Sequence, residues 1–271
     1  MDYRHIIYRP EKVARIILNR ARYRNAQSRL MIDEMDEAFE RAGSDDQVKV
    51  IVLSGLGDHF SAGHDLGTPE EVADQETRGF PADGPGVYKR FRDQFVEKTL
   101  RWRNLPKPTI AMVQGYCIFG GWIFASAMDI IFASEDALFL PSHTQYFPVP
   151  WDLGARKTKE VLFEHRFITA AEALENHFIN KVFPREKLEE KTLAYAERVA
   201  ENDPFQLRMV KYSVNHMLDT MGFTTEIEGA FQTYFVNRYP RWSDFKGVNV
   251  PGKNLAGADR ALMNLKASQE K

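Results

Sequence analysis

Short apolar runs alternate with amphipathic segments along the first half of the chain. Residues 13–18 form a short run rich in β-branched residues, and residues 48–53 read as a fully buried strand bounded by Ser54-Gly55, so both segments predict strands. Between them, apolar side chains recur at helical spacing after Ser28, a residue type that caps helices. The order strand, helix, strand predicts a βαβ unit and a parallel sheet.

A second unit of the same kind follows. Residues 109–113 predict a strand, residues 120–128 a helix and residues 129–133 another strand. Between the two units, residues 67–86 are rich in Gly, Pro and acidic residues and predict a mobile surface excursion. Residues 87–105 then predict an amphipathic helix.

From about residue 169 onward, helical patterns dominate and strand signals become scarce. The predicted helices cover residues 170–175, 187–202 and 204–221. The whole pattern therefore predicts a mixed α/β core followed by a helical C-terminal portion.

The composition narrows the class of protein. A chain of 271 residues that is 44% hydrophobic and 27% charged fits a soluble globular protein with one large domain, or one domain and a small appendage. Its 36 basic and 38 acidic side chains nearly balance, so no overall field attracts nucleic acid or an anionic membrane. Cys117 is the only cysteine, which excludes an internal disulfide and favours a cytoplasmic location.

Neither a secretory signal nor a membrane span is expected. Residues 1–10 carry charges and lack an apolar core, and the longest apolar stretch, residues 118–133, is interrupted by Ser126 and Asp129. The histidines show no ligand spacing with one another or with the cysteine, so no metal site is expected.

Two glycine-containing segments carry the candidate chemistry. Phe60-Ser61-Ala62-Gly63-His64-Asp65-Leu66 follows the strand at residues 48–53, and Gly115-Tyr116-Cys117-Ile118-Phe119-Gly120-Gly121-Trp122 follows the strand at residues 109–113 and opens a helix. Glycine lets a ligand approach the backbone closely, and the start of a helix has N–H groups without intrahelical acceptors. Two such donors that converge on one point would form an oxyanion hole, worth roughly 3–4 kcal/mol per donor.

In their order and spacing, these segments resemble the crotonase family, also called the enoyl-CoA hydratase/isomerase family. Other stretches fit the same family pattern: Asn19-Arg20 through Asn25-Ala26, residues 106–115, residues 129–133 and residues 168–182. The resemblance covers roughly residues 5–215, and the combination of motifs is specific.

The resemblance implies a fold of stacked ββα turns that form a spiral core, with C-terminal helices that mediate formation of a homotrimer or a dimer of trimers. Residues 1–200 would form the core with the acyl-CoA site, and residues 201–271 the helical oligomerisation region. An acyl-CoA substrate is implied, without a separate cofactor, because coenzyme A is part of the substrate.

By position, the resemblance assigns the two oxyanion donors to the main-chain N–H groups of His64 and Gly120. The segment that would line the adenine end of the CoA site contains Ala62, Asp65 and Leu66. Arg20 and Arg24 are candidates for binding the CoA phosphates, although an exposed, solvated loop is the alternative reading of this basic segment.

The chain departs from the family where the hydratases carry two glutamates that hold the attacking water. Ile123 and His143 stand at those two positions. Because isoleucine cannot transfer a proton, hydration by two carboxylates cannot operate unchanged. His143 and Asp152 are the remaining candidates for proton transfer, since histidine titrates near neutrality and a carboxylate can orient it.

A histidine and an aspartate at these positions resemble the pair in 6-oxocamphor hydrolase, a family member that breaks a C–C bond. Each residue also has a structural reading: the histidine as a hydrogen-bonding loop residue, and Asp152 as the cap of a helix over residues 153–163. The residues that would line a pocket for a bulky or alicyclic acyl group, or else pack in the core, are Trp122, Ile123, Tyr146 and Trp151.

The leading hypothesis is an acyl-CoA-processing enzyme that stabilises an enolate in the oxyanion hole, with His143 as general acid or base and Asp152 as its partner. The expected reaction is addition of water to an unusual enoyl-CoA or hydrolytic C–C cleavage of a β-oxo substrate. Two alternatives stay open: a double-bond isomerase, which needs one proton-transfer group, and a catalytically inactive scaffold that binds CoA or forms oligomers.

Overall fold

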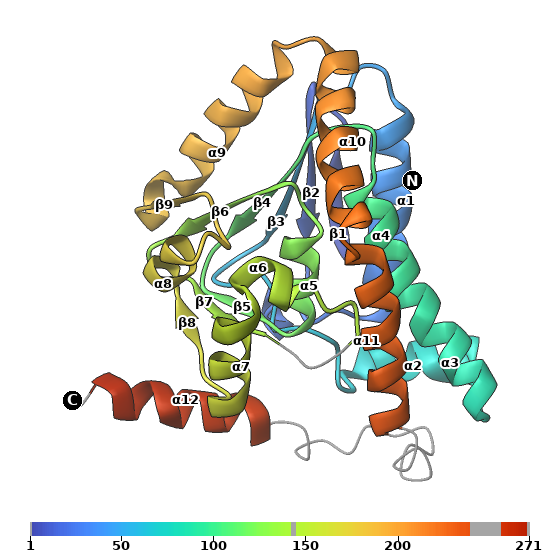
Figure 1. Ribbon diagram of the computed structural model, residues 1–271. Coiled ribbons are helices and arrows are strands. Elements are labelled where there is room, and N and C mark those ends of the chain that lie inside the picture. The colour runs from blue at the N-terminus through green and yellow to red at the C-terminus, as the bar shows by residue number, and fades with distance from the viewer. Residues whose placement is uncertain (1, 142–144, 239–255, 270–271) are drawn as a thin grey trace.

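The computed structural model describes residues 2–141, 145–238 and 256–269 (Figure 1). Within these ranges, two sheets form the centre of the molecule. The larger one has six strands in the order β1(Ile6–Arg9), β2(Val13–Leu18), β3(Val50–Gly55), β4(Thr109–Val113), β6(Ile130–Ser134), β9(Lys181–Phe183). The smaller one has the order β5(Tyr116–Ile118), β7(Leu138–Leu140), β8(Ile168–Thr169).

The larger sheet is parallel except at one edge, where β1 pairs antiparallel with β2. In the register of β2 and β3, Val13 lies opposite Val50 and Leu18 opposite Gly55. Every residue of β3 is buried, which explains the apolar stretch Val50-Ile51-Val52-Leu53, because both faces of a parallel sheet are covered. The predicted βαβ unit and parallel sheet are confirmed.

Different helices cover the two faces. On one face α1(Arg29–Ser44) contributes Met31, Met35 and Phe39 to the main core, and on the other α9(Arg185–Ala200) packs Leu188 and Ala196 against the sheet (Figure 1). The Ser28 side chain accepts a hydrogen bond from the amide of Met31 at 3.1 Å, so the predicted cap of α1 is confirmed.

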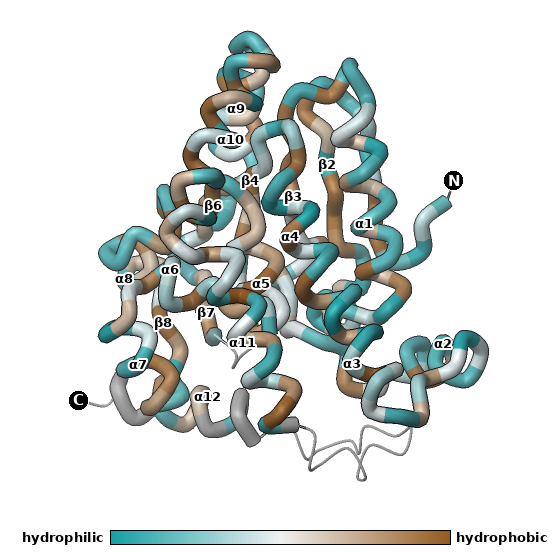
Figure 2. The backbone as a smooth tube through the Cα atoms, turned by 45° about the vertical axis from the view of Figure 1, so that its right-hand side comes forward, coloured by the Kyte–Doolittle hydropathy of each residue, from teal (hydrophilic) through white to brown (hydrophobic). Residues whose placement is uncertain are grey.

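Residues 67–86, predicted as a mobile surface excursion, lie at the surface with nearly all side chains partly or fully exposed, and they contain the helix α2(Pro69–Arg78). Thr68 caps the helix, proline occupies the first position, and Glu70 and Glu71 stand in the first turn. Proline and acidic residues are favourable at a helix start, so the proline and the acidic residues of this segment mark the N-terminus of α2. Figure 2 shows α2 as a largely hydrophilic segment, in contrast to the hydrophobic course of β2.

The amphipathic helix expected over residues 87–105 is present in three consecutive parts. These are α3(Gly84–Arg92), a π-helical turn at Asp93–Glu97 and α4(Lys98–Arg103). A π-turn inserts one extra residue per turn, and this one brings Phe95 next to the candidate site described below.

Helices dominate the rest of the described chain, as expected. They are α5(Gly120–Ser126), α6(Val149–Leu153), α7(Ala155–Glu164), α8(Ala170–Glu175), α10(Pro204–Thr220), α11(Phe223–Arg238) and α12(Ala256–Gln269). Helices α10 and α11 follow one another as a column (Figure 1), and α10 exposes apolar side chains such as Phe205 and Val210, which are 67% and 63% exposed. Exposed apolar surface of this kind suits an interface between chains. The domain boundary at residue 200 and the trimer remain predictions.

In the residues that the structure describes, no helix combines the length and apolar character that a bilayer crossing requires.

Candidate active site

The loop at residues 61–66 takes its shape from main-chain hydrogen bonds to residues 24–27. The amide of Ala62 donates to the carbonyl of Arg24 at 2.9 Å, and the amide of Gln27 donates to the carbonyl of Gly63 at 2.8 Å. The amide of Asp65 then donates back to the carbonyl of Gln27 at 3.0 Å. The loop therefore runs like an extra strand beside residues 24–27.

A second set of bonds joins the same loop to β5. The amide of Ser61 donates to the carbonyl of Tyr116, and the amide of Ile118 donates to the carbonyl of Ser61, both at 2.9 Å. The Ser61 hydroxyl donates to the carbonyl of Asn25 at 2.8 Å and accepts the amide of Gly63 at 3.1 Å. These bonds fix the loop against the chain segment that leads into α5.

The two glycines of the predicted oxyanion hole face one another across this junction. Gly63 has φ +87°, and a Cβ atom there would lie 2.7 Å from the carbonyl oxygen of Ile118 and 3.1 Å from the amide nitrogen of Gly120. A Cβ atom at Gly120 would lie 2.8 Å from two ring atoms of His64. Only glycine allows this approach of the two backbone segments.

The amide of Gly120 begins α5, where the helix itself supplies no acceptor. Among the described residues, this amide donates no hydrogen bond. The preceding residue, Phe119, has φ +50° and ψ −106°, a conformation that costs energy for a residue with a Cβ atom. The structure thus brings positions 64 and 120 together, and the convergence of their two amides on one oxygen remains a prediction.

The side chain of His64 is held between two glutamines. Its Nδ1 lies 3.1 Å from Gln27 Oε1 and its Nε2 lies 2.8 Å from Gln145 Oε1. Its ring packs on Phe95, with ring centroids 4.2 Å apart. Neither glutamine was predicted as a site residue from the sequence, although Gln27 directly precedes Ser28, the cap of α1.

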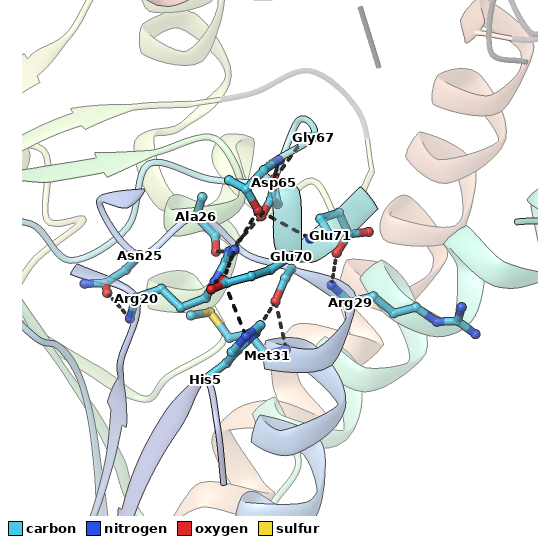
Figure 3. Close-up of polar contacts among 12 residues, drawn as sticks. His5, Arg20, Asn25, Ala26, Arg29, Met31, Asp65, Gly67, Glu70 and Glu71 are labelled. Atoms are coloured by element: carbon cyan, nitrogen blue, oxygen red, sulfur yellow. Dashed lines mark hydrogen bonds and ion pairs between the residues drawn. The ribbon is translucent and has the colours of Figure 1, made fainter. Parts of the chain in front are cut away.

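A cluster of largely buried charged side chains adjoins the loop at residues 61–66 (Figure 3). The guanidinium of Arg20 donates to Asp65 at 2.7 Å, to Thr68 Oγ1 at 2.7 Å and to Glu70 at 2.9 Å. The side chains of Arg20 and Asp65 are only 2% and 1% exposed. Burial alone would raise the pKa of Asp65, but hydrogen bonds from Thr68, Gly67 and Arg20 outweigh burial and lower it.

His5 and Glu34 connect this cluster to α1. The ring Nδ1 of His5 lies 2.7 Å from the Ser28 hydroxyl, and the Glu34 carboxylate accepts the amides of Arg4 and His5 at 2.8 and 2.7 Å. Burial and the neighbouring guanidinium of Arg20 lower the pKa of His5 to about 4, so its ring is neutral at physiological pH.

These contacts divide the residues predicted to bind CoA into two groups. Arg20 and Asp65 are buried and fully engaged with each other and their neighbours, so a contact with a CoA phosphate would require that network to open. Arg24 and Leu66 are exposed and Ala62 is partly exposed, so these three residues are accessible to a ligand.

Asp152 lies in α6 with its carboxylate against α5. Its Oδ2 accepts a hydrogen bond from Trp122 Nε1 at 2.7 Å and another from the Ser126 hydroxyl at 2.6 Å. The two donors are four residues apart and therefore share one face of α5. Burial raises the pKa of Asp152 from 3.8 to about 7, against the opposing effect of these two hydrogen bonds.

The alternative reading of Asp152 as a helix cap is wrong. The helix that was expected to begin at residue 153 is α7, which begins at Ala155, and its cap position is Gly154 without a side-chain hydrogen bond. The Asp152 carboxylate instead borders a cavity of about 580 Å³ that is also lined by Ser126, Trp151 and residues of α10.

The four residues proposed for an acyl pocket fall into two environments. Trp122, Ile123 and Tyr146 are at most 3% exposed and belong to the main core, where Trp122 stacks on Phe178 with ring centroids 4.0 Å apart. Trp151 is partly exposed and lines the cavity next to Asp152. The acyl pocket remains a prediction.

His143, the other proposed proton-transfer residue, lies outside the described residues. Its neighbour Gln145 lies within them and reaches His64, as described above. Across the described ranges, no three His, Cys, Asp or Glu side chains are grouped so as to hold a metal ion.

Most of the chain is similar to known proteins that share one family description. Residues 8–238 match the family model described as enoyl-CoA hydratase/isomerase. The chain is 36% identical over 255 residues to EchA13 of Mycobacterium tuberculosis, which carries the provisional description enoyl-CoA hydratase; the match spans 87% of this chain and 80% of that protein.

Solved structures agree with this family match. The crystal structure of a probable enoyl-CoA hydratase from Mycobacterium smegmatis is 38% identical with a TM-score of 0.80, over 90% of this chain and 98% of that one. The crystal structure of an enoyl-CoA hydratase/isomerase from Xanthobacter autotrophicus Py2 is 28% identical with a TM-score of 0.79, over 98% of this chain and 97% of that one. These similarities confirm the predicted fold class: the chain belongs to the enoyl-CoA hydratase/isomerase family.

Proposed function

We propose that this chain is an acyl-CoA-processing enzyme that stabilises an enolate of its thioester substrate. The observation that carries the proposal is the close approach of Gly63-His64 to Gly120, since it brings together positions 64 and 120, whose main-chain amides are the proposed oxyanion donors. The relatives' names support a thioester substrate, because each of them names an enoyl-CoA hydratase.

Asp152 is the proposed proton-transfer group within the described chain. A carboxyl group with a pKa of about 7 can both accept and give a proton at neutral pH. Its hydrogen-bond donors, Trp122 and Ser126, belong to α5, the helix that begins at Gly120.

His143 is the proposed second proton-transfer group, and with it the enzyme would add water to an unusual, bulky enoyl-CoA or cleave a C–C bond of a β-oxo substrate. Arg24, Ala62 and Leu66 are the proposed contacts of the CoA moiety. We also propose that the chain assembles into a trimer or a dimer of trimers and that it is located in the cytoplasm.

Turnover of a panel of enoyl-CoA and β-oxoacyl-CoA thioesters tests the proposal. The His143→Ala variant should lose nearly all turnover while its affinity for the acyl-CoA stays similar. Retained turnover would refute the role of His143. Binding of acyl-CoA without any conversion by the wild-type protein would favour a scaffold instead.

Isomerisation of a double bond is the second candidate. It needs one proton-transfer group, and Asp152 alone, with its pKa near neutrality, meets this need. Product analysis in heavy-oxygen water separates the two reactions, because hydration and hydrolysis place solvent oxygen in the product and isomerisation does not.

A further inference from the structure

A recess with an excess of positive charge lies between α1, α2 and α3. Helices α2 and α3 lie side by side (Figure 2), and the recess between them and the start of α1 has a volume of about 580 Å³. This volume falls in the range of roughly 300–1,000 Å³ that is usual for small-molecule sites. The charged side chains that line this cationic recess are those of Arg29, Arg78, Lys89 and Arg90, and of Asp33 and Asp93.

The two carboxylates of the cationic recess already have cationic partners. Asp33 accepts a hydrogen bond from Arg78 at 2.6 Å and forms an ion pair with Lys98. Arg78 also donates to Asp74 at 2.7 and 2.8 Å, so its own charge is compensated. Asp93 lies 3.9 Å from Lys98 and is half exposed. These pairs leave little negative charge for the other three cations of the recess.

The three remaining cations have no close carboxylate. In the part of the chain that the structure describes, Arg29 and Lys89 form no ion pair, and the guanidinium of Arg29 donates to the carbonyl of Gly79 at 3.2 Å. The carboxylate nearest to Arg90 is that of Glu71, 3.8 Å from Arg90 Nη2, which is too far for a hydrogen bond. Like charges that share a partly buried recess repel one another, so an anion that enters it is attracted by all three.

Arg90 is held in position by contacts that leave its charge uncompensated. Its side chain is 10% exposed, its Cζ lies 4.5 Å from the centroid of the Phe80 ring, and its Nε donates to Gln94 at 3.2 Å. Because Nη1 is enclosed by the protein, Nη2 is the terminal N–H group that a ligand in the recess can meet. Burial and the nearby charge of Arg29 lower the pKa of Arg90 to about 10, so its surroundings disfavour the charged form, although it stays protonated at neutral pH.

We propose that the cationic recess binds a phosphate group of a small molecule, with Arg90 and Arg29 as hydrogen-bond donors and Lys89 as a further cation. Hydrogen bonds from a guanidinium to a phosphate oxygen are roughly twice as strong as those between neutral groups. A phosphate monoester carries a charge of about −1.5 to −2 at pH 7, so it compensates three cations better than a single carboxylate does. The site is independent of the proposed function, and no covalent bond forms or breaks in it.

Calorimetric titration with inorganic pyrophosphate tests the recess, because this probe presents phosphate groups without an organic part. We expect one saturable site in the wild-type protein. Arg90→Met and Arg29→Met should each weaken binding about 10-fold, as expected for the loss of one charge-assisted hydrogen bond. Arg29 is partly exposed, so its variant keeps the test open if the buried Arg90 proves necessary for folding.

Arg92→Met is the matched control. Arg92 also lies in α3 and carries the same charge, but it does not line the recess, and its guanidinium donates to Glu228 at 2.5 and 2.6 Å. This variant should bind pyrophosphate as the wild type does. Absence of saturable binding by the wild type, unchanged affinity in both Arg90→Met and Arg29→Met, or an equal loss in Arg92→Met would each overturn the proposed site.

Competition with butyryl-CoA distinguishes two sources of the phosphate group. If a phosphate of coenzyme A occupies the recess, butyryl-CoA should displace pyrophosphate and should itself bind more weakly to Arg90→Met. If the phosphate belongs to a separate molecule, butyryl-CoA and pyrophosphate should bind together, and Arg90→Met should weaken the binding of pyrophosphate alone. Either result supports a phosphate site in the recess and identifies its source.

Discussion

Replacement of Asp152 by asparagine should change how the stability of the protein depends on pH. Both donors to this carboxylate, Trp122 and Ser126, bond to the same oxygen, so the oxygen of an asparagine amide can accept both. The substitution therefore keeps the shape and the two hydrogen bonds and removes the titrating group.

The size of the effect follows from the pKa of Asp152, which burial raises from 3.8 to about 7. The folded protein holds a proton on Asp152 in the interval between these values, whereas the unfolded chain has lost it. The contribution of Asp152 to the free energy of unfolding is therefore full below pH 3.8 and declines as the pH rises to about 7. Over the whole interval the decline amounts to about 4 kcal/mol, at about 1.4 kcal/mol per pH unit.

Urea unfolding of the wild type and of Asp152→Asn between about pH 5 and pH 8 measures this decline. We expect the wild type to lose stability relative to the variant as the pH rises, and the difference to level off above about pH 7. Asp46→Asn, at an exposed position, controls for the loss of one carboxylate. Parallel curves for the wild type and Asp152→Asn would refute the raised pKa and, with it, the proposed acid–base role of Asp152.

Three further substitutions test the support of the site. Trp122→Phe removes one donor to Asp152, so the pH at which stability levels off should move upward, as measured in the same urea experiment. Gly63→Ala should lower the free energy of unfolding by more than the roughly 1–3 kcal/mol of backbone strain expected at its φ of +87°. Gly79→Ala is its control, because its φ is +75° with open space around it, and an equal loss in both would contradict the predicted steric clash. Arg20→Met leaves a buried carboxylate without its partner and should cost roughly 3–5 kcal/mol in urea unfolding, whereas a loss below 1 kcal/mol would contradict the buried ion pair.

The central sheet could be predicted because its strands are marked locally. The largely apolar runs at β2 and β4 match the observed strands, since burial on both faces of the sheet favours apolar residues at most positions. Strands β1 and β9 were not predicted. They have four and three residues, which is too short for a periodic pattern to be distinguished from its surroundings.

The close approach of the two backbone segments of the site could be predicted from the sequence, but the contacts made by its side chains could not. The glycines at 63 and 120 are informative because each allows a close approach that other residues forbid. Arg20, by contrast, was assigned to CoA from its basic surroundings, and its burial against Asp65 depends on a contact 45 residues away along the chain. The same holds for Gln145, which reaches His64 over 81 residues. Such contacts follow from the fold and leave no local signal.

The loop at residues 61–66 is held mainly by hydrogen bonds between backbone atoms, and this affects which substitutions it can tolerate. Backbone atoms of residues 24–27 and of β5 hold the loop, so most of its shape does not depend on which side chains it carries. Side chains at positions 62, 64 and 66 can then change while the main-chain course of the loop stays in place. A protein built in this way can acquire a new substrate preference by single substitutions, without first rebuilding its catalytic framework.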